Sequence, residues 1–130
     1  MTTKILYIED NDQNFYLVSY ILSAKGLAVI RGRDGREGID LATREKPDII
    51  LLDIQLPVMD GYETARELRK IPGVSTIPVV ALTSYAMAGD REKALAAGCT
   101  GYIEKPINPK TFTEQIEQYI TAGVLRGDGG

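Results

Sequence analysis

The sequence has no histidine and no tryptophan, and Cys99 is the only cysteine among its 130 residues. Without histidine, the chain cannot form a Ser-His-Asp triad or an imidazole metal site, and it cannot itself supply a phosphohistidine. A single cysteine excludes an internal disulfide and a cysteine-rich metal cluster, so a small buried thiol is the expected role of Cys99. No apolar run approaches the length that crosses a bilayer, and the start MTTKILYIED does not have the pattern of a signal peptide. We therefore expect a cytoplasmic protein with no membrane partner.

The charge balance limits the function classes further. Fifteen Lys and Arg stand against eighteen Asp and Glu, which gives a net charge of −3 at pH 7. A nucleic-acid-binding domain usually has a basic face, so this balance argues against a nucleic-acid partner. A chain of this length is expected to form one domain with its own core. We assign residues 1–122 to that domain and the Gly-rich segment 123–130, GVLRGDGG, to a flexible tail.

Residues 48–61 read DIILLDIQLPVMDG, and the other motifs are arranged around this stretch. Residues 49–52 are continuously aliphatic, which is typical of a central parallel strand buried on both faces. Asp53 follows directly, at the carboxyl end of that strand, which is the edge where ligands bind in open α/β sheets. Taken alone, Asp53 is about equally well explained as a functional carboxylate and as a turn-capping residue. Asp60 and Gly61 indicate an ordinary turn.

Short apolar runs alternate with helical patterns along the chain, which predicts an α/β fold of the doubly wound, flavodoxin-like type with right-handed crossovers. We expect a five-stranded parallel sheet in the order 2-1-3-4-5 with five helices, and this order opens a cleft between strands 1 and 3. The fourth helix has mostly Ala at its apolar positions and is expected to be lightly anchored. The expected strands are 4–8, 27–30, 49–52, 79–82 and 101–103. The expected helices lie between residues 12 and 26, 34 and 45, 62 and 70, 87 and 97, and 109 and 120, and the first is expected to bury Phe15, Leu17, Val18, Ile21 and Leu22.

Polar side chains from four strand ends are expected to converge on the cleft. Three carboxylates at close range repel one another unless a cation neutralises them. All the candidate ligands are oxygens and the site is shallow, so Mg²⁺ fits better than Ca²⁺. We expect direct ligation by Asp10, Asp53 and the backbone carbonyl of Gln55, with Glu9 acting through water. The converging residues are Glu9 and Asp10 after strand 1, Asp53 after strand 3, Thr83 and Ser84 after strand 4, and Lys105 after strand 5.

The remaining polar groups of this set are suited to an anion. The Lys105 ammonium and the Thr83 hydroxyl are donors that have no place on a cation. A metal, a free carboxylate, an ammonium and a hydroxyl together provide the parts for in-line phosphoryl transfer to the carboxylate, with Asp53 as the nucleophile. The cation and Lys105 would neutralise charge on the phosphoryl oxygens.

These motifs fall in order at the strand ends over residues 4–120: Glu9-Asp10, Asp53 within LLDIQLPVMDG, Thr83-Ser84 and Lys105-Pro106. Together they resemble the motif set of the response-regulator receiver domains of two-component signalling. The EDN opening and the QLPVMDG loop are similar to single-domain regulators of the DivK kind and to receivers attached to hybrid kinases. No key position departs from the pattern.

The resemblance implies a phosphorylation-switched binding module with self-catalysed transfer and slow hydrolysis, and not a metabolic enzyme. It implies that a sensor histidine kinase or a histidine phosphotransferase phosphorylates Asp53, with Mg²⁺ required. It further implies that Thr83 and Ser84 belong to the switch, that Tyr102 turns inward as Thr83 moves toward the phosphoryl group, and that the peptide bond before Pro106 is commonly cis. A downstream protein would dock on the fourth helix, fifth strand and fifth helix.

Several alternatives remain open from the sequence. Taken singly, Asp10 is more often a helix cap, Glu9 a solvated acid, Lys105 a surface residue and Tyr102 a half-buried packing residue. A phosphatase of the haloacid dehalogenase kind also uses an Asp after a buried strand, but it wants a second Asp where this chain has Gln55. A flavodoxin-like electron carrier would need a phosphate cradle after strand 1, where this chain is acidic. By the family resemblance, Gln55 and Tyr85 flank the path of an attacking water, and a bulky Tyr85 is expected to slow loss of the phosphoryl group.

Overall fold

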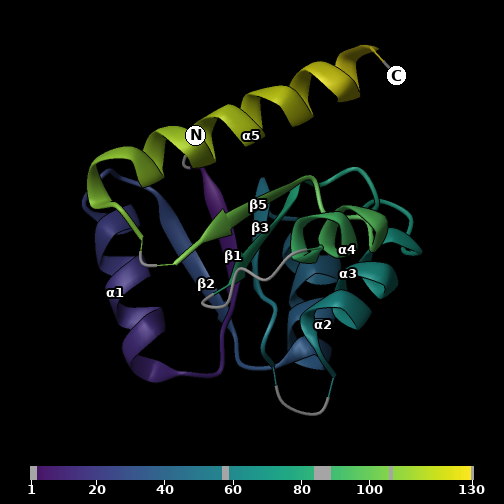
Figure 1. Ribbon diagram of the computed structural model, residues 1–130. Coiled ribbons are helices and arrows are strands. Elements are labelled where there is room, and N and C mark those ends of the chain that lie inside the picture. The colour runs from purple at the N-terminus through teal and green to yellow at the C-terminus, as the bar shows by residue number, and fades with distance from the viewer. Residues whose placement is uncertain (1–2, 57–58, 84–88, 106, 130) are drawn as a thin grey trace.

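The computed structural model describes residues 3–56, 59–83, 89–105 and 107–129, with side chains described as far as Thr121. Five parallel strands form one sheet in the order β2-β1-β3-β4-β5, so the predicted fold class and strand order are confirmed. β1 and β3 both run from the top of Figure 1 toward its lower edge. The strands are β1 (Lys4–Ile8), β2 (Ala28–Gly32), β3 (Ile49–Asp53), β4 (Val79–Thr83) and β5 (Gly101–Glu104), and the helices are α1 (Asp12–Ser23), α2 (Gly35–Glu45), α3 (Gly61–Arg69), α4 (Asp90–Ala96) and α5 (Pro109–Gly129).

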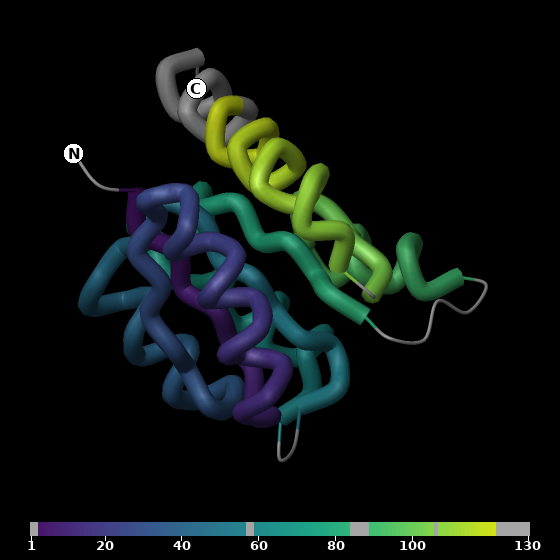
Figure 2. Tube along the Cα trace, turned by 90° about the vertical axis from the view of Figure 1, so that its left-hand side faces the viewer, coloured from purple at the N-terminus to yellow at the C-terminus, as the bar shows by residue number. Residues whose placement is uncertain are grey.

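Helices cover both faces of the sheet. α1 and α5 lie on one face, and α2, α3 and α4 lie on the other (Figures 1 and 2). Every residue of β3 and of β4 is therefore buried, which explains why their sequences IILLD and VVALT are nearly continuously apolar and do not alternate. The polar residue that ends each of these two strands lies at the carboxyl edge of the sheet.

Side-chain caps explain where several helices begin. The oxygens of Asn11, Asp34 and Asp60 accept hydrogen bonds of 2.8 to 2.9 Å from backbone N–H groups in the first turns of α1, α2 and α3. The cap of α1 is thus Asn11, so the alternative in which Asp10 caps this helix is wrong. Asn108 likewise caps α5, since its Oδ1 accepts a hydrogen bond of 3.0 Å from Lys110 N.

Some element boundaries and one buried face differ from the sequence prediction. α5 continues to Gly129, past residue 120, where the expected last helix ends. The division into a domain of residues 1–122 and a flexible tail of residues 123–130 stays a prediction. α4 covers only the middle of the expected range, whose first residues lie outside the described part of the chain. Leu17 was predicted to be buried but is 56% exposed, because α1 turns a stripe through Val18 and Leu22 toward the sheet.

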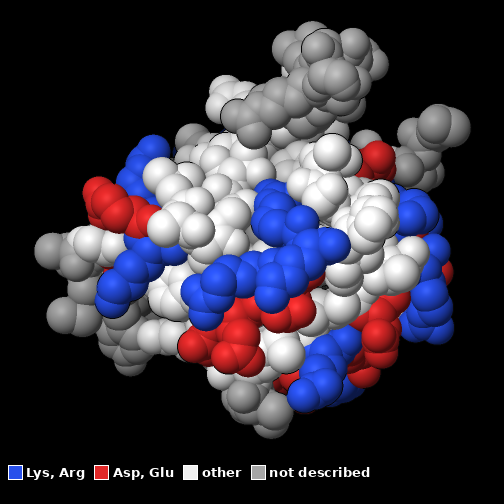
Figure 3. Space-filling model, turned by 90° about the vertical axis from the view of Figure 1, so that its right-hand side faces the viewer, with Lys and Arg blue, Asp and Glu red and all other residues white. Residues whose placement is uncertain are grey.

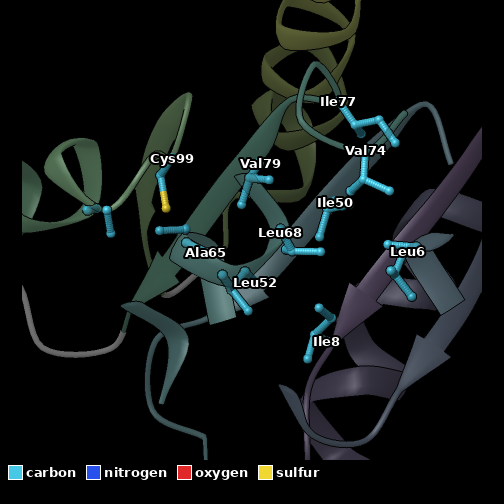
Figure 4. Close-up of a cluster of buried hydrophobic side chains, with 14 of the residues drawn as sticks. Leu6, Ile8, Ile50, Leu52, Ala65, Leu68, Val74, Ile77, Val79 and Cys99 are labelled. Carbon is cyan, nitrogen blue, oxygen red and sulfur yellow. The ribbon is translucent and has the colours of Figure 1, made fainter. Parts of the chain in front are cut away.

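The hydrophobic core has two halves, one on each face of the sheet. On the side of α2, α3 and α4, aliphatic residues of β1, β3 and β4 interdigitate with those of α3 (Figure 4). Cys99 belongs to this half, and burial raises the pKa of its thiol to about 11, so the predicted role as a buried thiol is confirmed. α4 contributes only Ala94 as a buried residue, which agrees with the expectation of a lightly anchored helix.

The surface of the described residues gives two further facts. No helix within these residues combines the length and the apolar character needed to span a membrane. On the face that α2, α3 and α4 cover, Lys and Arg side chains lie beside Asp and Glu (Figure 3). The two signs are mixed there, and the expectation that the protein binds no nucleic acid stays a prediction.

Candidate functional site

Backbone hydrogen bonds continue the sheet by one residue beyond the strands and so fix where the site residues start. The first residue of α3 also lies against this region, because a Cβ on Gly61 would overlap Ile54 Cα and the carbonyl oxygen of Asp53. α3 can therefore begin this close to the end of β3 only because residue 61 is Gly. The backbone hydrogen bonds run from Glu9 N to Gly32 O (2.9 Å), from Ile54 N to Leu82 O (3.1 Å) and from Lys105 N to Thr83 O (2.7 Å).

Four of the predicted site residues come together at this edge. Carboxylate oxygens of Glu9, Asp10 and Asp53 lie within 4.8 Å of one another. Lys105 Nζ is 3.1 Å from Glu9 Oε1 and 3.4 Å from Asp53 Oδ2, so one ammonium bridges two of the three acids. Glu9 is fully buried and Asp53 is 4% exposed, whereas Asp10 is exposed. The cluster is thus a buried ion pair with a third carboxylate at its solvent-facing side.

The three carboxylates fit a hard divalent cation. They offer only oxygen atoms as ligands. Glu9 and Asp53 are buried residues at strand ends, whereas Asp10 is exposed, so the cluster can be reached from solvent on the side of Asp10. Asp53 Oδ1 also accepts a hydrogen bond of 2.8 Å from Gln55 N, so Asp53 makes the turn-capping contact while its Oδ2 faces Lys105. Gln55 is exposed at the start of the loop that follows β3.

Tyr7 is a member of this site that sequence reasoning missed. Its ring is fully buried in β1, and its hydroxyl donates a hydrogen bond of 2.9 Å to Glu9 Oε1. Burial, reinforced by the nearby Glu9 carboxylate, raises the pKa of Tyr7 far above its usual range, so the hydroxyl stays a donor. A signal was present: a Tyr within the apolar run KILYI needs a buried hydrogen-bond partner, and Glu9 lies two positions along on the same face.

Arg31 of β2 supports the same corner from the other side. Its Nε donates to the carbonyl oxygen of Glu9 at 3.1 Å, and its Nη1 forms an ion pair with Asp12 Oδ1 at 2.7 Å. The guanidinium lies 4.8 Å from the ring centroid of Phe15, which in turn stacks on Tyr7 with centroids 5.7 Å apart. Arg31 therefore connects the end of β1 with the first turn of α1.

Burial and charge divide one proton unequally between Asp53 and Glu9. Burial, together with a hydrogen bond to Glu9, raises the pKa of Asp53 to about 7, although Gln55 N and Lys105 act in the opposite direction. Burial also acts to raise the pKa of Glu9, but hydrogen bonds from Asp53, Lys105 and Tyr7 and the charge of Lys105 outweigh it and lower that pKa. Without a cation, the shared proton near neutral pH therefore resides mainly on Asp53.

This shift predicts a pH-dependent effect of Asp53→Asn on stability. Between the ordinary pKa of 3.8 and about 7, the folded state keeps a proton on Asp53 that the unfolded state releases, so wild-type stability falls as pH rises through this window. Asn is uncharged at every pH and retains the acceptor for Gln55 N. The stability of the variant relative to wild type is expected to grow between pH 4 and pH 7 and to level off above it. Denaturant unfolding in the presence of a chelator measures this, and an equal difference at both ends of the window would contradict it.

Thr83 and Tyr102 form a second polar contact next to the acid cluster. Thr83 ends β4 and is 3% exposed, and its hydroxyl hydrogen-bonds the hydroxyl of Tyr102. Burial raises the pKa of Tyr102, assisted by Asp90, while the hydrogen bond with Thr83 opposes the increase. The predicted switch pair is thus in direct contact. Ser84, Tyr85 and Pro106 lie outside the described residues.

Comparison with known proteins identifies relatives of the whole domain. A family model for the response regulator receiver domain matches residues 5–117. The polar-differentiation response regulator DivK of Brucella ovis is 42% identical over 120 residues, which cover 92% of this chain and 98% of that protein. Relatives from Brucella suis and Brucella abortus have the same identity and the same name.

Solved structures agree with this sequence relationship. The receiver domain of a sensor histidine kinase from Pseudomonas aeruginosa PAO1 superposes with a TM-score of 0.86 at 35% identity, over 93% of this chain and 99% of that one. That structure has a magnesium ion coordinated in its active site cleft. The chemotaxis protein CheY4 of Vibrio cholerae has a TM-score of 0.86 at 28% identity, over 92% of this chain and 99% of that one. The similar proteins thus include response regulators and a receiver domain of a sensor kinase.

Proposed function

The chain belongs to the response regulator receiver domain family, and from this premise we propose that it is a phosphorylation-activated response regulator that accepts a phosphoryl group on Asp53. The observation that supports this most is the position of Asp53. Its carboxylate is nearly buried, within 4.8 Å of two further acids and 3.4 Å from the Lys105 ammonium. A carboxylate that only stabilised the fold would not need two further acids within 4.8 Å at the edge of the sheet.

The proposed reaction is a displacement at phosphorus. One carboxylate oxygen of Asp53 attacks the phosphorus of a phosphohistidine, the new P–O bond forms as the P–N bond breaks, and the departing imidazole nitrogen keeps the electron pair and takes a proton from water. Asp53 must be ionised to attack, and the pKa of about 7 means that metal-free protein near neutral pH is only partly in that form. Lys105 then pairs with the oxygens of the transferred group, and Thr83 donates a hydrogen bond to it.

The residues that would hold Mg²⁺ are Asp10, Asp53 and the backbone carbonyl of Gln55 directly, with Glu9 through water. When bound, Mg²⁺ supplies positive charge that keeps Asp53 ionised and neutralises the phosphoryl oxygens. Asp10 suits the role because it is exposed and does not cap α1, so its carboxylate remains available at the open side of the cluster.

A phosphohistidine donor has to lie outside this chain, because the chain has no histidine. We propose a sensor histidine kinase or a histidine phosphotransferase. α1 begins two residues after Asp10 and exposes apolar side chains, which provides a surface on which such a donor can dock. These exposed residues are Tyr16 (65%), Leu17 (56%) and Tyr20 (76%).

The phosphorylated state would be read on the face formed by α4, β5 and α5. The contact between Thr83 and Tyr102 connects this face to the site, because drawing the Thr83 hydroxyl toward a phosphoryl group removes the hydrogen bond from Tyr102. α4 buries only Ala94, so shifting it sacrifices little apolar contact. Ser84 and Pro106 are proposed to assist the switch. The protein would act alone by docking or relay the phosphoryl group.

The family match does not favour the two alternative functions. A phosphatase of the haloacid dehalogenase kind wants an acid at the position of Gln55, and a flavodoxin-like carrier wants a phosphate cradle where Glu9 and Asp10 lie. Beyond transfer to Asp53 and slow hydrolysis of the product, we propose no enzymatic activity.

The proposal is tested by the chemistry of the linkage. Incubation with Mg²⁺ and a small acyl phosphate is expected to add one phosphoryl group per chain, and hydroxylamine is expected to remove it and leave a hydroxamate at Asp53, because acyl phosphates react with this nucleophile and phosphate esters do not. Intact mass and peptide mapping measure both. A hydroxylamine-resistant phosphoryl group, or a hydroxamate at another residue, would contradict the assignment.

A further inference from the structure

The Tyr7 hydroxyl is held rigidly against the acid cluster. Its hydrogen bond to Glu9 Oε1 is 2.9 Å long and buried. The ring cannot rotate away from Glu9, because it is fully buried and stacks on the ring of Phe15. Tyr7 and Glu9 lie two positions apart and therefore on the same face of the sheet. The sequence motifs of the site do not include Tyr7, and the proposed reaction above does not use it.

Two donors share one oxygen of Glu9. Lys105 Nζ lies 3.1 Å from the same Oε1 that accepts from Tyr7, and it also lies 3.4 Å from Asp53 Oδ2. The other oxygen, Oε2, has a long contact of 3.4 Å with Asn11 N, and the protonated Asp53 carboxyl also hydrogen-bonds Glu9. An Asp53 that carries a phosphoryl group has no proton to donate. If Lys105 then moved away, the Tyr7 hydroxyl would give the one short hydrogen bond from a protein group to the Glu9 carboxylate among the described residues.

We propose that Tyr7 is a positioning residue that keeps Glu9 hydrogen-bonded while the Lys105 ammonium transfers from Glu9 to the phosphoryl oxygens on Asp53. Glu9 is fully buried, so water does not readily replace a lost donor, and a buried carboxylate without its partner is strongly unfavourable. With the hydroxyl in place, Lys105 can leave at a smaller cost in free energy. The inference rests on the proposed function, since it assigns Lys105 to the phosphoryl group.

The experiment compares two ligands in wild type and Tyr7→Phe. Beryllofluoride, which mimics a phosphoryl group on Asp, requires the Lys105 transfer, whereas Mg²⁺ alone does not. We expect Tyr7→Phe to weaken beryllofluoride binding at saturating Mg²⁺ by about tenfold, the scale of one hydrogen bond to a charged group, and to leave Mg²⁺ affinity within about twofold of wild type. NMR titrations followed at the backbone amides of Gln55 and Lys105 measure both affinities and report whether the variant is folded.

Two further variants separate positioning from general disturbance. Tyr20→Phe makes the same change at a position that is 76% exposed and makes no contact with the acid cluster. Tyr20 belongs to the proposed donor-docking surface, but neither ligand needs a donor protein, so both affinities are expected to stay unchanged. In a Glu9→Gln background, the neutral amide no longer holds Lys105 by charge, so adding Tyr7→Phe is expected to weaken beryllofluoride binding by less than about twofold.

Each outcome decides the inference. Selective loss of beryllofluoride affinity supports it. Unchanged affinities for both ligands, or a parallel loss of both, would overturn it, since the hydroxyl would then be dispensable or would only shape the acid cluster. If the wild-type protein binds no beryllofluoride, both the proposed function and this inference are overturned. If the wild type binds beryllofluoride and Tyr7→Phe binds it with the same affinity, only the inference is overturned.

Discussion

Asp53→Ala is expected to abolish phosphorylation by both a small acyl phosphate and a partner phosphohistidine, with a loss on the order of 10³-fold or more, as for removal of a nucleophile. The reason is that Asp53 is the acid to which the other groups of the site are directed. Its Oδ1 is fixed by Gln55 N at 2.8 Å and its Oδ2 lies 3.4 Å from Lys105 Nζ. The substitution by Ala removes the attacking oxygen and leaves strand β3 and the other two acids, Glu9 and Asp10, in place.

The neighbouring acids are not expected to take over. Glu9 is fully buried, and its Oε1 already accepts from Tyr7 and Lys105, so its carboxylate is neither free nor directed outward. Asp10 is exposed and hydrated, without the strand-end position of Asp53. Each of them lies close enough to Asp53 to share a cation with it, which is the role we assign to both.

Labelling with a radioactive acyl phosphate, followed by intact mass, measures the effect. Asp40→Ala is the matched control, because Asp40 is exposed on α2 and lies in none of the contacts of the site. Asp53→Asn adds a variant that keeps the side-chain shape and the hydrogen bond from Gln55 N. Labelling that persists in either Asp53 variant at the wild-type level, with the hydroxylamine sensitivity of an acyl phosphate, would move the acceptor to another carboxylate.

The fold could be predicted from the sequence because each strand is short, apolar and separated from the next by one helix. The continuous burial of Ile49–Asp53 and Val79–Thr83 needs both faces of the sheet covered, and that condition restricts the arrangement to a few topologies. Boundaries were less certain where packing decides them. Leu17 was misplaced because the helical pattern of α1 fits a broad apolar face, while only a narrow stripe of a surface helix meets the sheet.

The site could be predicted as far as its residues follow strand ends. Convergence of Glu9, Asp10, Asp53 and Lys105 follows from strand order alone, because the carboxyl ends of parallel strands meet at one edge. The pairing of donors and acceptors within the cluster did not follow. Which oxygen Lys105 approaches, and which acid holds the proton, depend on distances and burial that no spacing in the sequence specifies.

Tyr7 and Arg31 were missed for a related reason. Tyr7 lies inside an expected strand, where Tyr is taken for an apolar residue, and Arg31 directly follows the expected strand 27–30, where Arg is taken for a solvated one. Only the packing of Phe15 between them shows that both are directed at the end of β1. Polar groups within apolar runs are therefore the positions at which a sequence analysis of such a site should look for additional members.

Lys105→Met is expected to have opposite effects on two properties of the site. Lys105 Nζ lies 3.1 Å from Glu9 Oε1 and 3.4 Å from Asp53 Oδ2, so the ammonium already neutralises part of the charge that a cation would neutralise. Met keeps much of the length and apolar stem of Lys but removes this charge. Mg²⁺ should therefore bind more tightly, by about tenfold, because a competing positive charge next to the same acids is gone.

Phosphoryl transfer should change in the other direction. Loss of one fixed donor to the developing charge typically costs about 10²- to 10³-fold in rate, and Lys105 is the cationic side chain in contact with Asp53 among the described residues. The metal-free variant should also be less stable than wild type above pH 7, where the buried acids are left without their partner, and Mg²⁺ should restore more stability to it than to wild type.

Calorimetric Mg²⁺ titration and acyl-phosphate labelling at saturating Mg²⁺ measure the two effects separately. Lys110→Met is the control, since Lys110 is exposed in the first turn of α5 and is expected to leave both quantities unchanged. A site in which Lys105 served only to fold the acids together would lose Mg²⁺ affinity along with phosphorylation. Tighter Mg²⁺ binding combined with slower phosphorylation would mean that the ammonium pairs with the acids before transfer and with the phosphoryl group during transfer. Weaker binding of Mg²⁺ to Lys105→Met would contradict this double role.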